Sequence, residues 1–275
     1  MARRGARGPG WFVRVAAPIA GLAVCALAGE PRRAIARNLV RVRGRRGRLR
    51  EALDVGQTFI NYASCLAESL GSGAEGTTPA RAIVRGELFF QDALAGGHGV
   101  VLVTAHTAGW EILGAALARG RGRPLTLVVA EEGDPTAAAI QDGARLAPGV
   151  RVAHAGRDPL AALALSAQLR AGGVVALQID RAPAAVRSRG VALFGEPARL
   201  PEGPLRLAML TGAPIVPAFV ARSGFRRYEV TVRPPLVLSR ASTDADLDAA
   251  ARRLATELET FVRVHPTQWF HFRSE

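Results

Sequence analysis

The chain has 275 residues, of which 49% are hydrophobic and 21% are charged, so it is long and apolar enough for one large globular domain. Its two cysteines exclude a disulfide framework, and the low charged fraction excludes a disordered chain. All 36 basic residues are arginines, and 13 of them lie in residues 1–50 with a single acid, whereas the other 225 residues carry 23 arginines and 22 acids. A nucleic-acid-binding protein usually carries its basic stripe on the folded domain. Here the charge flanks an apolar segment, which favours an anionic membrane surface over nucleic acid as a partner.

The first predicted element is an apolar helix near the amino terminus. Residues 15–28 would form a helix of about 21 Å, and residues 11–29, which include Arg14, one of about 28 Å, close to the thickness of a bilayer core. An arginine near a helix end can snorkel to the headgroups. We therefore expect residues 1–30 to form a membrane anchor, with a cleaved signal peptide and a soluble helix as alternatives. The nine arginines between residues 32 and 50 favour a following domain on the cytoplasmic side of the inner (plasma) membrane.

Beyond residue 50 the apolar pattern alternates between helical spacing and short β-branched runs, which is typical of an α/β domain. The predicted strands are residues 82–84, 100–104, 125–129, 150–153, 174–178, 191–194, 215–220 and 228–232. The predicted helices are residues 49–70, 87–95, 109–119, 136–146, 159–170, 202–210 and 244–264. Because helices separate most of the strands, we expect an α/β fold with a mostly parallel central sheet flanked by helices over residues 31–275, behind the hydrophobic anchor helix.

The most informative stretch is residues 100–117, in which a buried strand leads into His106 and then into a predicted helix that contains Glu111. Ligands of open α/β sheets bind beyond the carboxyl ends of the strands, and His106 stands at such an end. A spacing of five residues corresponds to about 140° of helix rotation, so the two side chains meet only if His106 lies on the turn before the helix. A carboxylate on one imidazole nitrogen would strengthen the other nitrogen as a general base for a hydroxyl. The alternative is that both side chains are structural.

His106 and Glu111 resemble the HX4D/E motif of the lysophospholipid acyltransferase superfamily, and the glutamate resembles its lipid A lauroyl and myristoyl acyltransferase branch. Residues 172–220 are similar to that branch in order and spacing, with Asp180 after a strand and then a Phe-Gly pair. The terminal Pro-Thr-Gln-Trp-Phe run at residues 266–270 is like the tryptophan motif that closes these enzymes. The resemblance covers about residues 11–272, so residues 31–275 are expected to form one acyltransferase domain.

The resemblance implies acyl transfer, without a metal or cofactor, from a thioester of acyl carrier protein or coenzyme A to a hydroxyl of a membrane glycolipid of the lipid A precursor type. His106 would be the general base, Glu111 would orient it, and backbone amides at the start of the following helix would stabilise the oxyanion. The arginines near the aspartate that follows the strand at 174–178 would bind phosphate or an acidic carrier protein. The candidate substrate-binding residues are Asp180, Arg181, Arg187, Arg189 and Trp110. Each has a structural alternative, such as a cap, an ion pair, a solvated face or core packing.

One departure keeps the acceptor open. Lipid A acyltransferases commonly have an arginine just beyond the strand that follows the HX4E helix, where this chain reads Ala130-Glu131-Glu132. A phosphatidylinositol mannoside or a lysophospholipid is therefore an alternative acceptor, and a catalytically silent lipid-binding protein of the same fold is the alternative from another class. Residues 201–203, Pro-Glu-Gly, also resemble the phosphate-binding block of glycerolipid acyltransferases, although Glu202 can equally be a first-turn helix acid. Trp269 is expected to be structural.

Overall fold

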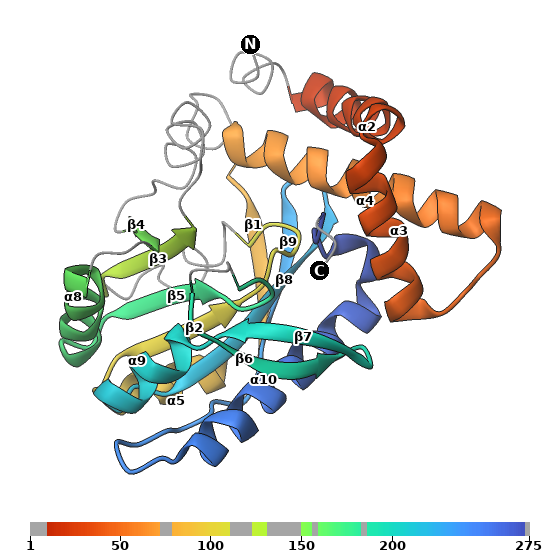
Figure 1. Ribbon diagram of the computed structural model, residues 1–275. Helices are drawn as coiled ribbons and strands as arrows, with labels where there is room; N and C mark the ends of the chain where they lie inside the picture. The colour runs from red at the N-terminus through yellow and green to blue at the C-terminus, as the bar shows by residue number, and fades with distance from the viewer. Residues whose placement is uncertain are drawn as a thin grey trace.

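The computed structural model describes residues 10–71, 79–110, 123–130, 150–155, 159–182 and 186–272. A seven-stranded sheet forms the centre of the molecule (Figure 1). Its strands, in spatial order, are β1 (Arg81–Arg85), β9 (Arg227–Val232), β8 (Ile215–Gly224), β2 (Val100–Thr104), β5 (Val174–Gln178), β3 (Leu125–Ala130) and β4 (Val150–Ala155). All neighbouring pairs are parallel except β8 and β9, which are antiparallel. The predicted α/β fold with a mostly parallel sheet is confirmed.

Helices cover the sheet, and a separate hairpin lies beside it. The helices are α2 (Gly10–Leu27), α3 (Gly29–Arg43), α4 (Arg48–Leu70), α5 (Glu87–Ala95), α8 (Pro159–Arg170), α9 (Gly203–Thr211), α10 (Asp244–Val264) and the 3-10 turn η1 (Pro266–Gln268). The hairpin consists of β6 (Ser188–Leu193) and β7 (Glu196–Pro201). The predicted helices at 109–119 and 136–146 fall largely outside the described residues.

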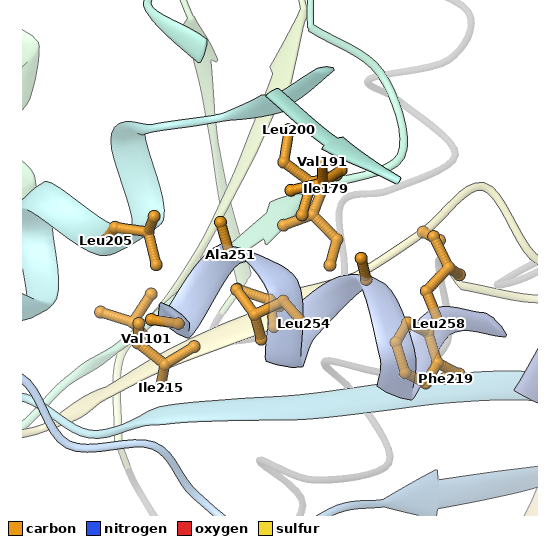
Figure 2. Close-up of a cluster of buried hydrophobic side chains, with 14 of the residues drawn as sticks. Val101, Ile179, Val191, Leu200, Leu205, Ile215, Phe219, Ala251, Leu254 and Leu258 are labelled. Carbon is orange, nitrogen blue, oxygen red and sulfur yellow. The ribbon is translucent and has the colours of Figure 1, made fainter. Parts of the chain in front are cut away.

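Strand β2 occupies the middle of the sheet because its sequence, Val-Val-Leu-Val-Thr, buries side chains on both faces. One face carries a core contributed by β2, β8, α9, the hairpin and α10, whose converging side chains Figure 2 shows. The other face carries a second core that includes Phe90 of α5, Tyr228 of β9 and Phe270. The carboxyl end of β2 therefore lies on a strand that is fixed from both sides.

The amino-terminal helices pack on one another. Helix α2 buries Val13, Ala17 and Gly21, and its main neighbour is α4. Gly21 marks the point of closest approach, because a Cβ atom there would lie 2.6 Å from the carbonyl oxygen of Phe59 in α4. Helix α2 is the one helix among the described residues that is long and apolar enough to cross a membrane, with a mean hydropathy of 1.7.

One α-helix and one strand have no counterpart in the sequence-based expectation, and the strand predicted at residues 191–194 is found at Ser188–Leu193, which leaves Phe194 in a turn. Helix α3 was not predicted, because its arginines obscure a buried stripe at helical spacing that includes Ile35, Leu39 and Val42. Strand β7 was not predicted either. It contains two prolines, which are rare in strands, and its short alternating pattern forms a strand only by pairing with β6 in a two-stranded hairpin. The hairpin matters for the site, since its turn carries Phe194 and Gly195.

Candidate active site

Two neighbouring strands place His106 and Asp180 at the same edge of the sheet. Strands β2 and β5 are parallel and in register, with Thr104 opposite Gln178. The pairing continues one step further, since the amide of Ile179 donates to the carbonyl of Thr104 at 2.9 Å. His106 and Asp180 each lie two residues beyond these strand ends. The sheet thus brings together two side chains that are 74 positions apart in the sequence.

The imidazole and the carboxylate form a direct hydrogen bond. The distance between Nδ1 of His106 and Oδ1 of Asp180 is 2.8 Å, and the backbone amide of His106 donates to the same oxygen at 3.2 Å. The other oxygen, Oδ2, accepts from the indole Nε1 of Trp269 at 3.0 Å. The side chain of Asp180 is fully buried, whereas that of His106 is 27% exposed. The pair therefore has a closed carboxylate side and an open imidazole side.

The surroundings keep Asp180 ionised. Burial alone would raise the pKa of this carboxyl, but His106 and Arg181 outweigh it, and the pKa is lowered well below its usual range. An ionised carboxylate only accepts hydrogen bonds, so Nδ1 of His106 carries the proton of the shared bond. The opposite nitrogen, Nε2, is then unprotonated in the neutral ring. This is the tautomer that a general base requires.

The carboxy-terminal segment closes the buried side of the pair. Arg181 donates from Nη2 to the carbonyl of Phe270. The imidazole of His271, which is 2% exposed, lies with its centroid 5.0 Å from that of Trp269. Burial lowers the pKa of His271 to about 4, so this second imidazole is neutral near pH 7. No sequence pattern assigns a role to His271 or a polar contact to Trp269.

The predicted partner of His106 falls outside the described residues, because these end at Trp110 and resume at Arg123, so that Glu111 is not among them. The condition for a meeting of the two side chains does hold, since His106 lies on a turn after β2 and not within a helix. Trp110 is buried, and its ring lies edge-on to the imidazole with centroids 6.4 Å apart. Trp110 thus covers one side of the His106 ring.

The arginines that were predicted to bind substrate differ in their ion pairs and in their exposure to solvent. Arg189 forms ion pairs with Glu202, Asp244 and Asp248 at 2.6–2.9 Å, and these carboxylates, Asp248 foremost, raise its pKa. Glu202 also pairs with Arg206 at 2.7 Å, so the Pro-Glu-Gly block binds arginines through its carboxylate. Arg187 is exposed. Of the three arginines after Asp180, Arg187 is the one whose side chain faces solvent most openly.

The amides that were expected to stabilise an oxyanion are mostly occupied. The amide of His106 donates to Asp180, and those of Thr107, Ala108 and Trp110 donate to carbonyls of Ala105, Gln268 and Thr107, respectively. These four groups are therefore not available to an oxyanion in this conformation. Among the described residues, no group of three or more His, Cys, Asp or Glu side chains is placed to hold a metal ion.

The pairing of His106 with Asp180 has a signal in the sequence. Both side chains follow a predicted buried strand at an offset of two residues. If the two strands are neighbours in a parallel sheet, this shared offset places the side chains together. The missing information was the order of the strands, which the sequence does not state.

The sequence of this chain is similar to the sequences of known acyltransferases. The sequence profile of the bacterial lipid A biosynthesis acyltransferases matches residues 19–275. A phosphatidylinositol mannoside acyltransferase from Mycobacterium tuberculosis H37Rv is 32% identical over 182 residues, which are 64% of this chain and 54% of that protein, and the sequence from strain CDC 1551 matches equally. The aligned region thus spans about half the length of these relatives.

Among solved structures, the 1-acyl-sn-glycerophosphate acyltransferase from Thermotoga maritima aligns over 93% of this chain and 98% of its own, with 12% identity and a TM-score of 0.40. The profile match extends over nearly the entire chain, from α2 through the β2 and β5 strand ends to the carboxy-terminal segment. The chain belongs to the bacterial lipid A biosynthesis acyltransferase family.

Proposed function

We propose that this protein is an O-acyltransferase that moves a fatty acyl chain from a thioester to a hydroxyl of a membrane glycolipid. The observation that carries the proposal is the 2.8 Å contact between Nδ1 of His106 and the buried carboxylate of Asp180. It leaves Nε2 of a half-exposed imidazole as a base at the carboxyl edge of the sheet, where α/β proteins bind their ligands. The family supports the same chemistry.

The reaction follows from this tautomer. Nε2 of His106 accepts the proton of the acceptor hydroxyl while the hydroxyl oxygen attacks the thioester carbonyl. Asp180 stabilises the imidazolium that forms, because its negative charge is already in contact with Nδ1. When the tetrahedral intermediate collapses, the carbon–sulfur bond breaks, and the proton on Nε2 passes to the leaving thiolate. The products are an ester and a free thiol, and the imidazole returns to its starting state.

We propose for Glu111 a role different from the one that the motif implied. Asp180 already occupies Nδ1 of His106, so Asp180 is the residue that orients the imidazole. Glu111 is then proposed to act on the acceptor side of His106 by accepting a hydrogen bond from a second hydroxyl of the glycolipid, because the attacking hydroxyl gives its one proton to Nε2 of His106. On this assignment the Glu111→Gln change lowers turnover less than Asp180→Asn or His106→Ala.

The family profile and the relatives point to two glycolipid acceptors. The profile is that of lipid A biosynthesis enzymes, whereas the relatives at 32% identity are phosphatidylinositol mannoside acyltransferases. The chain also lacks an arginine at residues 131–132, directly after β3. We therefore propose a phosphatidylinositol mannoside as the second candidate acceptor beside a lipid A precursor. A lysophospholipid has no separate observation in its favour.

The donor is proposed to be acyl carrier protein or a coenzyme A thioester, both of which carry phosphate. Arg181 is half-buried and donates to the Phe270 carbonyl, and Arg189 is surrounded by carboxylates. Arg187, which is exposed, is the arginine that fits a contact with the donor phosphate.

The location proposed for the protein is the cytoplasmic face of the inner (plasma) membrane, with residues 1–30 as the anchor and residues 31–275 as the catalytic domain. Outside its contact with α4, helix α2 exposes large apolar side chains such as Trp11, Ile19 and Leu27. Between α2 and α4 lies an apolar cavity of about 310 Å³. An exposed apolar helix followed by exposed arginines is the pattern of a segment that lies in the headgroup region of an anionic membrane.

The test combines labelled acyl-carrier-protein and coenzyme A donors with a panel of lipid A precursor, phosphatidylinositol mannoside and lysophospholipid acceptors. The full chain in detergent–lipid micelles is compared with His106→Ala, and products are identified by mass spectrometry. His98→Ala is the matched control, because His98 is exposed at the opposite end of β2. A gain of one acyl chain that His98→Ala retains and His106→Ala loses supports the proposal. Lipid binding without turnover by the wild-type chain would favour the silent lipid-binding alternative.

A further inference from the structure

The carboxy-terminal segment after α10 pairs with the turn that carries His106. The amide of Ala108 donates to the carbonyl of Gln268 at 3.0 Å, and the amide of Phe270 donates to the carbonyl of His106 at 2.7 Å. Between these two bonds, Thr107 and Trp269 form an antiparallel bridge. The backbone of residues 268–270 therefore fixes Trp269 directly opposite the catalytic turn.

From this position the indole reaches the carboxylate from the side opposite to the imidazole. Nε1 of Trp269 donates to Oδ2 of Asp180 at 3.0 Å, while Oδ1 of the same carboxylate faces Nδ1 of His106. A carboxylate that is bonded through only one oxygen can rotate about its last side-chain torsion, which is soft. A carboxylate that is bonded through both oxygens keeps one orientation.

The indole is itself held in place. Trp269 is 3% exposed, and its ring packs near those of Phe194, at a centroid distance of 5.5 Å, and His271, at 5.0 Å. Phe194 has a φ of +53°, in the left-handed region that a bulky residue rarely adopts. Its amide donates to the carboxylate of Glu259, and the guanidinium of Arg263 lies 5.4 Å from its ring centroid. Strained backbone of this kind persists when its surroundings hold it in place, and it is concentrated near functional sites.

We propose that Trp269 is a positioning residue for the acyl-transfer reaction. Its indole N–H locks Asp180 so that Oδ1 stays on Nδ1 of His106, and Phe194 buttresses the indole. The proposal rests on the proposed function, in which Nε2 of His106 is the base. A free neutral imidazole prefers the tautomer with its proton on Nε2. In that tautomer Nε2 cannot accept the proton of the acceptor hydroxyl. Asp180 must therefore stay aligned to keep the proton on Nδ1, and Trp269 keeps it aligned.

The test replaces Trp269 with benzothienylalanine, which keeps the bicyclic shape but has sulfur in place of the N–H group. Nitrogen-15 NMR of histidine-labelled protein reports the tautomer of His106, with its signals assigned by their loss in His106→Ala. We expect the fraction of the Nδ1–H tautomer to fall and kcat to fall about 10- to 100-fold, the range for loss of a hydrogen bond to a charged group, while KM changes less than about twofold. Trp269→Phe, which keeps a ring against Phe194, is expected to shift the tautomer in the same direction.

A double-mutant cycle with Asp180→Asn separates positioning from packing. If Trp269 acts through Asp180, its replacement lowers kcat little further in the Asp180→Asn background. Equal losses in both backgrounds, or a normal tautomer in the benzothienylalanine protein, would overturn the proposal, as would a lowered unfolding midpoint with an unchanged tautomer. The tautomer is read without turnover. A His106→Ala protein that still turns over would therefore refute the general base and leave the role of Trp269 in aligning Asp180 to be judged by NMR.

Discussion

Asp180 and Glu68 are two buried carboxylates that differ in their hydrogen-bond partners. The side chains of both are at most 4% exposed, and each accepts hydrogen bonds from several donors. Glu68 of α4 binds the guanidinium of Arg222, the amide of Arg226 and the hydroxyl of Tyr228. Asp180 instead binds the imidazole of His106, as well as its amide and the indole of Trp269.

The chemistry of the partners separates a structural carboxylate from a catalytic one. Arginine stays protonated, and burial raises the pKa of Tyr228, so neither the Arg222 nor the Tyr228 side chain exchanges a proton near neutral pH. The partner of Asp180 is an imidazole, a side chain that can act as a general base, and it is open to solvent on one side. Among the described residues the other two buried acids, Glu202 and Glu257, also pair with arginines. Only Asp180 combines burial with a histidine partner there.

The largest effect is expected from Asp180→Asn. The amide can donate as well as accept, so it no longer fixes the proton on Nδ1 of His106, and it carries no charge to stabilise the imidazolium. We expect kcat to fall at least about 10²-fold, within the range by which a positioned base contributes, with KM little changed. Steady-state kinetics checks this, and the unfolding midpoint shows that the chain folds. If Asp180→Asn turned over at near the wild-type rate, the contrast between the two carboxylates would not concern catalysis.

The converse change, Glu68→Gln, should affect stability. It leaves the partly exposed guanidinium of Arg222 without its counter-charge. The loss of one partner of a fully buried pair destabilises proteins by about 3–5 kcal/mol, and we expect a smaller loss here because the side chain of Arg222 is 17% exposed. Urea unfolding measures the change. The kcat of the remaining folded fraction should stay within about threefold of wild type. A stable Glu68→Gln protein with low kcat would contradict the assignment, because Glu68 would then act on the site.

Acid should destabilise the fold through the groups around Asp180. Burial lowers the pKa of His271 from an ordinary value of 6.5 to about 4, so between these pH values the unfolded chain binds a proton that the folded chain does not. Stability is then lost as the pH falls from about 6.5 to about 4, by at most about 3 kcal/mol. The lowered pKa of Asp180 adds a loss only below about pH 4, the usual value of an aspartate.

The variant His271→Phe keeps a ring against Trp269 but removes the titrating group. Urea midpoints at pH 7.5, 5.5 and 4.5 should therefore decline less steeply for this variant than for wild type. The comparison uses the slope with pH and not the absolute stability, because the substitution also changes packing. Parallel slopes would mean that His271 is not the source of the acid sensitivity.

The sequence predicted elements best where local signals agree with the fold. Helix α10 runs from Asp244 to Val264 as expected, because Thr243 and Asp246 form a capping box at its start. Strand β2 also has its predicted bounds, because its β-branched run suits a strand that is buried on both faces. Helix α3 was missed, since only its packing shows that an arginine-rich segment has a buried stripe.

The site was predicted only in part, because some of its contacts have local sequence signals and others do not. His106 could be recognised from its position after a strand and from the motif around it. Its contact with Asp180 depends on the neighbouring positions of β2 and β5, and the contact of Trp269 with Asp180 joins residues 89 positions apart. Such contacts follow from strand order and from the path of the carboxy-terminal segment, neither of which has a local sequence signal.

The smallest predicted effect concerns Gly109, which lies between the turn that carries His106 and the ring of Tyr228, a partner of Glu68. Gly109 follows the His106 turn with a φ of +75°, and a Cβ atom there would lie 2.3 Å from the ring of Tyr228, whose hydroxyl binds Glu68. Gly109→Ala should therefore both strain the backbone and displace either the Tyr228 ring or the catalytic turn. Gly97→Ala is the matched control, since Gly97 has a φ of +81° but nothing within 4 Å of a Cβ atom.

The left-handed conformation alone should destabilise both alanine variants by about 1–2 kcal/mol. Only Gly109→Ala is expected to lose activity as well, by about tenfold, because only there does the new methyl group meet a side chain that is anchored by a buried carboxylate. Unfolding midpoints and kcat measured on the same preparations separate the two contributions. Equal kcat values for the two variants would mean that the Glu68 network supports the fold without setting the position of His106.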